Sequence, residues 1–190
     1  RFDEAGGFLT WTGFILARAE NGIKDIGQFN QIEPIFAGKS AACMVKRDIF
    51  GKAGGFDRSF GILGEESDLA WRIWSQGHKV IWAPKSVTYH AFGTKFKSID
   101  KFYTDERIYF NGCRNYLHML LKNAPPRMLA LALPLQVSVW SFAAIGQLLH
   151  GRPKACLLIF QALSYIFLNL KLILKQRSEI QREAKIEWKE

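Results

Sequence analysis

The segment Gly64-Glu65-Glu66-Ser67-Asp68 holds the densest group of side chains that could take part in catalysis, with three carboxylates within four residues. It directly precedes an apolar stretch with helical spacing. Acidic residues are favoured at a helix N-terminus because they interact with the helix dipole and cap the first turn, so a structural role alone would explain them. The glycine allows a tight turn, however, and the aromatic residues Phe56, Phe60 and Trp71 could shield a carboxylate from water. A desolvated carboxylate can act as a general base.

A histidine is the second candidate for chemistry. His90 ends the segment 86–90, whose composition predicts a strand. A lone histidine at a strand end is commonly a surface or hydrogen-bonded residue. It could also supply one ligand to a divalent metal ion whose carboxylate ligands come from elsewhere in the fold. The residues themselves leave both interpretations open.

A basic and polar pair, Arg114-Asn115, lies in the segment 95–122, which has helical spacing, and Arg107 falls on the same face two turns earlier. These three residues could contact a phosphate or an acceptor, and an exposed basic face is an equally good interpretation. A phosphate-binding loop is not predicted elsewhere. Gly38-Lys39-Ser40 resembles the end of such a loop, but Glu33 stands where the loop requires glycine, so we predict a turn there.

The elements that must position these residues are short. Apolar and β-branched runs predict strands at 8–16, 79–82 and 86–90. A helix is predicted from residue 67 or 68 to residue 76, because apolar residues recur there at helical spacing and Gly77 suits the position after a helix end. Short strands that alternate with helices indicate an α/β layered fold.

The C-terminal third has a different character. Residues 128–149 and 155–170 carry no charged side chain, and the basic segment 150–154 separates them. The first stretch is long enough to span a bilayer, which takes about 20 apolar residues, whereas the second is short. Because basic residues flank the pair and polar residues interrupt it, we expect two helices that lie in or shallowly enter the cytoplasmic leaflet. A soluble helical pair packed on the rest of the protein is the alternative.

The same change in composition predicts two regions. Residues 1–124 would form the domain that carries the acid segment, and residues 125–190 would form an apolar helical hairpin and a charged C-terminal helix. The charged helix is predicted over 175–190, where the signs of the charges alternate.

Composition limits the classes of protein to which the chain can belong. Hydrophobic residues make up 48% and charged residues 23% of the 190 residues, which excludes a disordered or fibrous chain. The net charge of +9 favours an anionic partner such as a nucleotide, a nucleic acid or a phospholipid surface. No stacking or groove-reading motif supports a nucleic-acid partner, so none is expected. The three cysteines form no CxxC pair, which argues against a disulfide framework or a zinc site.

The motifs also form one ordered series, which resembles the second half of the catalytic domain of a family 2 glycosyltransferase. The series consists of Gly54-Gly55-Phe56-Asp57, the acid segment 64–68 running into Leu69-Ala70-Trp71-Arg72, then Gly77, Pro84 and Tyr89-His90. Arg114-Asn115 and Lys122-Asn123, which precede the apolar tail, resemble the rhamnosyltransferase-like members that build bacterial or archaeal surface glycans.

This resemblance implies an inverting transfer of a sugar from a nucleotide-sugar donor to a glycan or lipid-linked acceptor. Glu66, the second acid of the pair, would be the general base that deprotonates the acceptor hydroxyl, at a position where family members often have aspartate. Glu65, Asp68 and Arg72 would position the acceptor and the loop. His90 would join a divalent metal, Mn²⁺ or Mg²⁺, that neutralises the departing diphosphate.

One feature of the family is missing from the chain. The Asp-x-Asp metal motif of the family's nucleotide-binding half does not occur in the sequence. We therefore expect an incomplete GT-A-type domain whose first strands lie upstream of Arg1, and a fragment without measurable transferase activity. The alternative is a non-catalytic, basic, membrane-associated binding or scaffold protein. The protein is expected at the cytoplasmic face of the cell membrane, as a peripheral or monotopic protein, with a membrane-spanning hairpin as the alternative.

Overall fold

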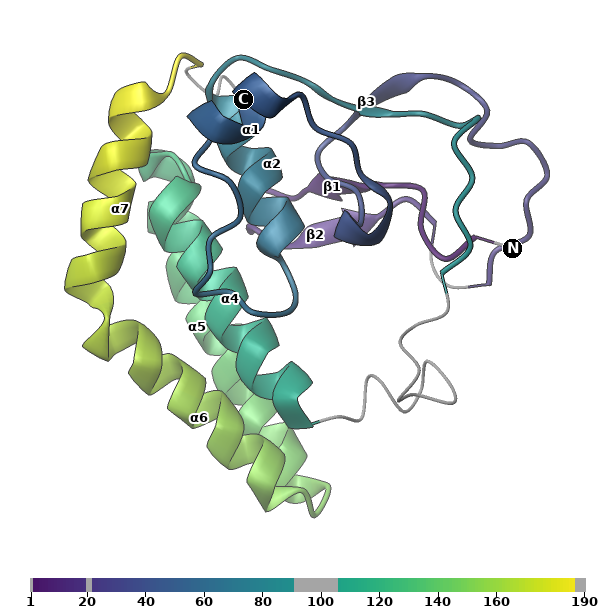
Figure 1. Ribbon diagram of the computed structural model, residues 1–190. Helices are drawn as coiled ribbons and strands as arrows, with labels where there is room; N and C mark the ends of the chain where they lie inside the picture. The colour runs from purple at the N-terminus through teal and green to yellow at the C-terminus, as the bar shows by residue number, and fades with distance from the viewer. Residues whose placement is uncertain (1, 20–21, 91–105, 187–190) are drawn as a thin grey trace.

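The computed structural model describes residues 2–19, 22–90 and 106–186 (Figure 1). Two small sheets together with α1 and α2 form one side of the molecule, and the helices α4 to α7 form the other. The strands are β1 (Gly7–Leu9), β2 (Ile15–Ala17), β3 (Glu33–Ile35) and β4 (Val80–Trp82). The helices are the 3₁₀ turn η1 (Ser40–Ala42), α1 (Arg47–Lys52), α2 (Glu65–Ser75), α4 (Glu106–Asn123), α5 (Pro126–Leu149), α6 (Pro153–Leu168) and α7 (Leu170–Glu183).

Both sheets are antiparallel pairs of three-residue strands. β1 pairs with β2, and β3 pairs with β4. The backbone N–H of Gly7 donates to the carbonyl oxygen of Ala37 at 2.8 Å, which connects the two sheets. The predicted α/β class is therefore confirmed in the coarse form of a mixed α/β fold with few strands. The described residues form no parallel, doubly wound sheet.

The predicted strand at 8–16 is a hairpin, so this prediction was wrong. β1 and β2 are joined by a turn in which Gly13 has a φ of +81°. The tip of this hairpin lies between α4 and α5, because Gln136 Nε2 donates to the carbonyl oxygen of Thr12 at 2.8 Å, and a Cβ on Gly13 would lie 2.7 Å from the side chain of Leu120. These tertiary contacts, together with a glycine that tolerates a left-handed turn, explain why the apolar run reverses.

The other predicted elements vary in outcome. The strand predicted at 79–82 is confirmed as β4, whereas 86–90 is not a strand in the structure. α2 begins at Glu65, two residues before the predicted start, and Gly77 follows its end with a φ of +86°. Of the helix predicted over 95–122, residues 95–105 lie outside the described residues. The same holds for residues 187–190 of the charged C-terminal helix.

α4 lies at the centre of the molecule and has two differently occupied faces. One face joins a core cluster formed mainly by the sheets, α2 and the start of α5, with Phe36, Phe60, Trp71, Met119 and Leu120 as its large members. The opposite face joins a second cluster with α6 and α7, which includes Cys113, Leu117, Leu121, Ile159 and Ile173. The boundary predicted at 124/125 falls between α4 and α5, and both clusters contain residues from each side of it.

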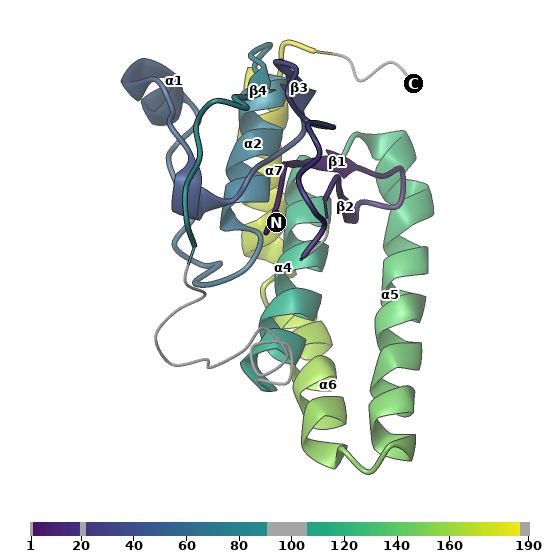
Figure 2. The same cartoon turned by 90° about the vertical axis from the view of Figure 1, so that its right-hand side faces the viewer.

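α5 and α6 form an antiparallel hairpin that extends away from the strands (Figure 2). α5 is long and apolar enough to cross a membrane, and only 17% of its most apolar stretch is buried. α6 and α7 together are also long and apolar enough to cross a membrane, but the two helices are bent by 63° relative to each other. The apolar side chains that the hairpin exposes include Leu131, Phe142, Leu149, Leu157, Phe167 and Leu168. One or two apolar helices could therefore associate with a membrane.

Candidate active site

The acid segment occupies the first turn of α2, directly after a left-handed turn of the backbone. Leu63 has a φ of +73° and Gly64 a φ of +80°. All three carboxylates of the segment lie in the first helical turn, where the dipole favours them. Helical geometry separates them, because Asp68 is fully buried whereas Glu65 and Glu66 remain half-buried.

Helix α4 holds the loop that precedes the acid segment. Asn115 is only 2% exposed, and its Nδ2 donates to the carbonyl oxygens of Phe60, Ile62 and Leu63 at 3.1, 2.8 and 2.6 Å. The guanidinium of Arg114 donates to the same Phe60 oxygen. The contacts of Arg114 and Asn115 therefore support the loop, and a phosphate or acceptor contact for either residue stays a prediction.

Asp68 is the centre of a buried charged network. Its carboxylate accepts hydrogen bonds from Arg72 Nη2 and Asn123 Nδ2, both at 2.7 Å, and lies 3.0 Å from Lys122 Nζ. Lys122 also donates to Asp57 of the Gly-Gly-Phe-Asp turn. Burial alone would raise the pKa of Asp57, but the hydrogen bond and the charge of Lys122 outweigh burial and hold this pKa well below its usual range. The network thus ties the turn, α2 and α4 together.

Glu66 lies in the opposite electrostatic environment. Burial is the largest influence on its carboxyl group, followed by the neighbouring charge of Glu65 and, more weakly, that of Glu4, and together they raise the pKa of Glu66 to about 7. The structure describes no ion pair that would offset these influences. A carboxylate with such a pKa holds a proton strongly yet is substantially ionised at neutral pH, which suits a general base.

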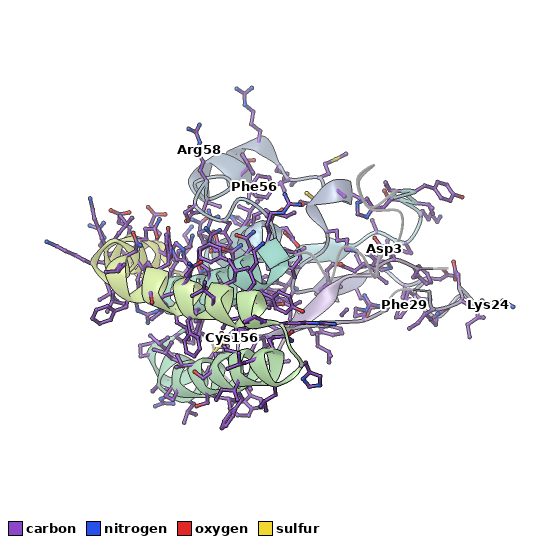
Figure 3. The ribbon with its side chains drawn as sticks, turned by 90° about the horizontal axis from the view of Figure 1, so that it is seen from below. Asp3, Lys24, Phe29, Phe56, Arg58 and Cys156 are labelled. Carbon is purple, nitrogen blue, oxygen red and sulfur yellow. The ribbon has the colours of Figure 1, made fainter. Side chains whose placement is uncertain are left out.

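The N-terminal segment, which we call the wall, lies beside the strands and away from Cys156 of α6 (Figure 3). Asp3 Oδ2 accepts a hydrogen bond from Lys39 Nζ at 2.8 Å and lies 3.0 Å from His90 Nδ1. Lys39 Nζ also lies 3.9 Å from Glu4. The charge of Glu4 also contributes to the raised pKa of Glu66, so this segment acts electrostatically on the acid segment.

Asp3 and Glu4 of the wall and the nearby His90 are residue types that could bind a metal ion. Within the described ranges, no three His, Cys, Asp or Glu side chains are grouped so that they could hold a metal ion. Asp3 is already shared by Lys39 and His90. The described residues alone therefore do not form a metal site, and we derive no step through a metal.

The structure places the predicted site residues in three groups. His90 contacts Asp3 of the wall, whereas Glu65 and Glu66 lie in the first turn of α2, where Ser40 contacts Glu65. Asp68 and Arg72 lie in the buried network. Arg107, Arg114 and Asn115 lie on α4, where Arg107 is exposed near the start of the helix.

Sequence reasoning assigned no role to Asp3, Glu4, Lys39 or Ser40. The Ser40 hydroxyl lies 3.3 Å from Glu65 Oε1, so this segment contacts the acid segment directly. The turn predicted at 38–40 is occupied by the start of η1, and Lys39 immediately precedes that element. Asp3-Glu4 was visible as an acidic pair, but nothing in its spacing connects it with residues 36 to 87 positions away.

Phe56 does not shield the acid segment as predicted. It is 41% exposed and makes an edge-to-face contact with Phe50 of α1, with ring centroids 5.6 Å apart. Phe60 and Trp71 are fully buried. Trp71 packs edge-to-face on Phe36, and Phe60 stacks on His118 of α4. These two rings therefore anchor the loop and the helix in the core.

Comparison with known proteins agrees with the motif series. Residues 3–174 match the family model described as Glycosyl transferase family group 2. No curated protein and no solved structure matches the chain. The family match runs from the acidic wall at Asp3 through α5 and α6 into α7, so the apolar helices belong to the matched region. Because the match covers most of the 190 residues, the chain belongs to glycosyl transferase family group 2.

Proposed function

We propose that the protein transfers a sugar from a nucleotide-sugar donor to a glycan acceptor with inversion, and that Glu66 is the general base. The observation that carries this proposal is a half-buried carboxylate whose pKa is raised to about 7 by burial and by the charges of Glu65 and Glu4. Glu66 would take the proton of the acceptor hydroxyl. The acceptor oxygen would then form the bond to the anomeric carbon while the bond to the diphosphate oxygen breaks.

The neighbouring residues would orient the acceptor and position the loop. Glu65, which lies beside Glu66 and contacts Ser40, would orient the acceptor. Asp68 and Arg72 would position the loop through the buried network, since Arg72 also donates to the carbonyl oxygen of Ala53. From the motif series we further propose a rhamnosyltransferase-like role in the synthesis of a surface polysaccharide.

Glu66→Gln tests the proposed base. In the protein as its gene encodes it, transfer from a panel of nucleotide-sugars should fall by about 10²- to 10⁴-fold, because the amide cannot accept the proton. Binding of the nucleoside diphosphate, measured by calorimetry, should stay nearly unchanged. Glu179→Gln on the exposed surface of α7 makes the same chemical change away from the site and should retain activity. A Glu66→Gln protein with wild-type turnover would contradict the assignment.

A metal role for His90 stays a prediction of the sequence. Members of the family commonly use divalent metals, and we propose that His90 contributes to binding Mn²⁺ or Mg²⁺. The test is a metal titration of transferase activity, in which His90→Ala should raise the metal concentration required. His150→Ala, at the exposed end of α5, is the matched control. An identical titration for His90→Ala and wild type would leave His90 as a hydrogen-bonded partner of Asp3 only.

We also propose that the acceptor is lipid-linked and that the α5–α6 hairpin brings the site to the cytoplasmic face of the membrane. The support is the exposed apolar surface of the hairpin together with the basic residues at its turn, such as Arg152 and Lys154. The protein should float with anionic liposomes, and Phe142→Ser with Phe167→Ser should weaken flotation. Failure to float would contradict membrane association.

The same surface favours the second candidate, a non-catalytic membrane-associated scaffold. The two functions differ in the role of the acid segment. A scaffold would float with liposomes but would show no transfer with any nucleotide-sugar, and Glu66→Gln would leave its measurable properties unchanged.

A further inference from the structure

Leu63 has an unusual backbone conformation. It is the non-glycine residue with a positive φ in the part of the chain that the structure describes, at +73°. Residues with a Cβ are disfavoured in the left-handed region, and they persist there only when the surrounding structure holds them. The question is therefore what holds Leu63.

The side chain of Asn115 supplies the restraint. Its Nδ2 donates to the carbonyl oxygens of Phe60, Ile62 and Leu63, and the last of these bonds is the shortest, at 2.6 Å. Its Oδ1 accepts a hydrogen bond from Arg114 Nε at 2.8 Å, which fixes the orientation of the amide. Because Asn115 is buried in the middle of α4, the loop is held from a rigid element.

The restrained turn determines where α2 begins. The carbonyl oxygen of Gly64, the residue after Leu63, accepts the first helical hydrogen bond from the N–H of Asp68 at 2.9 Å. Glu66 lies in that same turn, two residues after Gly64. A change in the backbone at Leu63 would therefore rotate the first turn and move the Glu66 carboxylate.

We propose that Asn115 is a positioning residue, which holds Leu63 in the left-handed conformation and thereby places Glu66 against the acceptor. The effect on catalysis rests on the proposed function, whereas the effect on the loop does not. The phosphate or acceptor contact considered from the sequence stays a separate prediction.

Asn115→Ala tests the proposal with two readouts. Hydrogen exchange of the peptide covering residues 60–68 should become faster, because the carbonyl oxygens of Ile62 and Leu63 lose the Asn115 amide that restrains the loop. In the protein as its gene encodes it, kcat should fall by about 10- to 100-fold, since small misplacements of a catalytic group have effects of this size. The KM for the donor should stay within about twofold, because the loop would act on the acceptor side. Asn111→Ala, one turn earlier on α4, should change neither readout.

Relief of the strain provides the decisive comparison. Glycine adopts a positive φ without cost, so Leu63→Gly in the Asn115→Ala protein should restore much of the lost kcat. Ile62→Gly in the same background should not, because the φ of Ile62 is not positive. Equal rescue by both glycines, or normal exchange of residues 60–68 in Asn115→Ala, would overturn the proposal.

If Asn115→Ala does not fold, Leu63→Val tests the same device from the loop side, because a β-branched residue is less tolerant of a positive φ and should give faster exchange and a lower kcat. If Glu66→Gln retains activity, the assignment of the base fails. The exchange of residues 60–68 would still decide whether Asn115 holds the loop.

Discussion

The loop and first turn around the acid segment contain two pairs of carboxylates in contrasting surroundings. The inner pair, Asp57 and Asp68, forms ion pairs with Lys122 of α4 and with Arg72, and Asp68 also accepts a hydrogen bond from Asn123. The rim pair, Glu65 and Glu66, faces the N-terminal segment and forms no ion pair among the described residues. The pKa of Asp57 is held low, whereas the pKa of Glu66 is raised to about 7.

This difference separates acids suited to a structural role from acids suited to chemistry within residues 57–68. A carboxylate that is buried with its cations cannot take up a proton near neutral pH, so it serves to fix the backbone. A carboxylate that is buried beside other carboxylates is ready to accept a proton at neutral pH. The inner pair would therefore hold the rim pair in place. Variants of the inner pair should lower the stability of the fold, whereas variants of the rim pair should change the activity and its pH dependence.

The largest effect on stability should follow from Lys122→Met. This change removes the cation shared by Asp57 and Asp68 while keeping a side chain of similar length, so Asp57 loses its ion pair and Asp68 retains only Arg72 as a cation. Breaking a buried pair in this way costs about 3–5 kcal/mol. Urea denaturation would measure the loss. Lys175→Met, an exposed position on α7, should change the free energy of unfolding by less than about 0.5 kcal/mol.

A smaller and pH-dependent effect is expected for Asp57→Asn. Loss of a hydrogen bond to a charged partner should lower the free energy of unfolding by about 1.5–3 kcal/mol at pH 7. Because the pKa of Asp57 is lower in the folded state, its contribution is complete above the unfolded value of 3.8 and is lost as the pH falls below it. The difference in the free energy of unfolding between wild type and Asp57→Asn should therefore become smaller in acid. A difference that stays constant down to pH 2 would contradict the ion pair with Lys122.

From the sequence, Glu65, Glu66 and Asp68 could be predicted only as one acidic cluster, and Asp57 only as part of a separate turn. Local signals located α2, its C-terminal Gly77 and the apolar helices, because helical periodicity and turn residues act over a few positions. Asp68 and Glu66 have equally acidic neighbours in the sequence. Only the position of α4, which supplies Lys122 and Asn123 more than 50 residues later, distinguishes the two carboxylates.

Other parts of the site depend on contacts that sequence patterns do not encode. Asp3 meets Lys39 and His90, which follow it by 36 and 87 residues. The run at 8–16 has the composition of a strand, and its reversal depends on the bond from Gln136 to Thr12. Asn115 was considered as a phosphate or acceptor contact next to an arginine, but its hydrogen bonds reach a backbone turn 52 residues earlier.

Glu65→Gln should change the pH dependence of activity without a comparable loss of stability. The charge of Glu65 and its hydrogen-bonding contact both raise the pKa of Glu66, so removing the charge should lower that pKa. Since the base must be ionised, kcat/KM should rise with pH through about 7 in wild type, and this rise should occur at lower pH in Glu65→Gln. If kcat/KM rises at the same pH in both proteins, Glu65 does not influence the pKa of the base.

Glu4→Gln should have the same direction of effect and the smallest size. Glu4 acts on Glu66 across the site, and its influence ranks below that of Glu65. Burial raises the pKa of Glu4 itself, while Lys39 opposes this rise, so part of its charge is already offset. The pH at which kcat/KM rises should therefore fall by less than in Glu65→Gln, and the double variant should show the largest fall of the three. Glu179→Gln controls for the loss of one negative charge from the protein. A Glu4→Gln profile that moves to higher pH would show that the charge of Glu4 does not raise the pKa of the base.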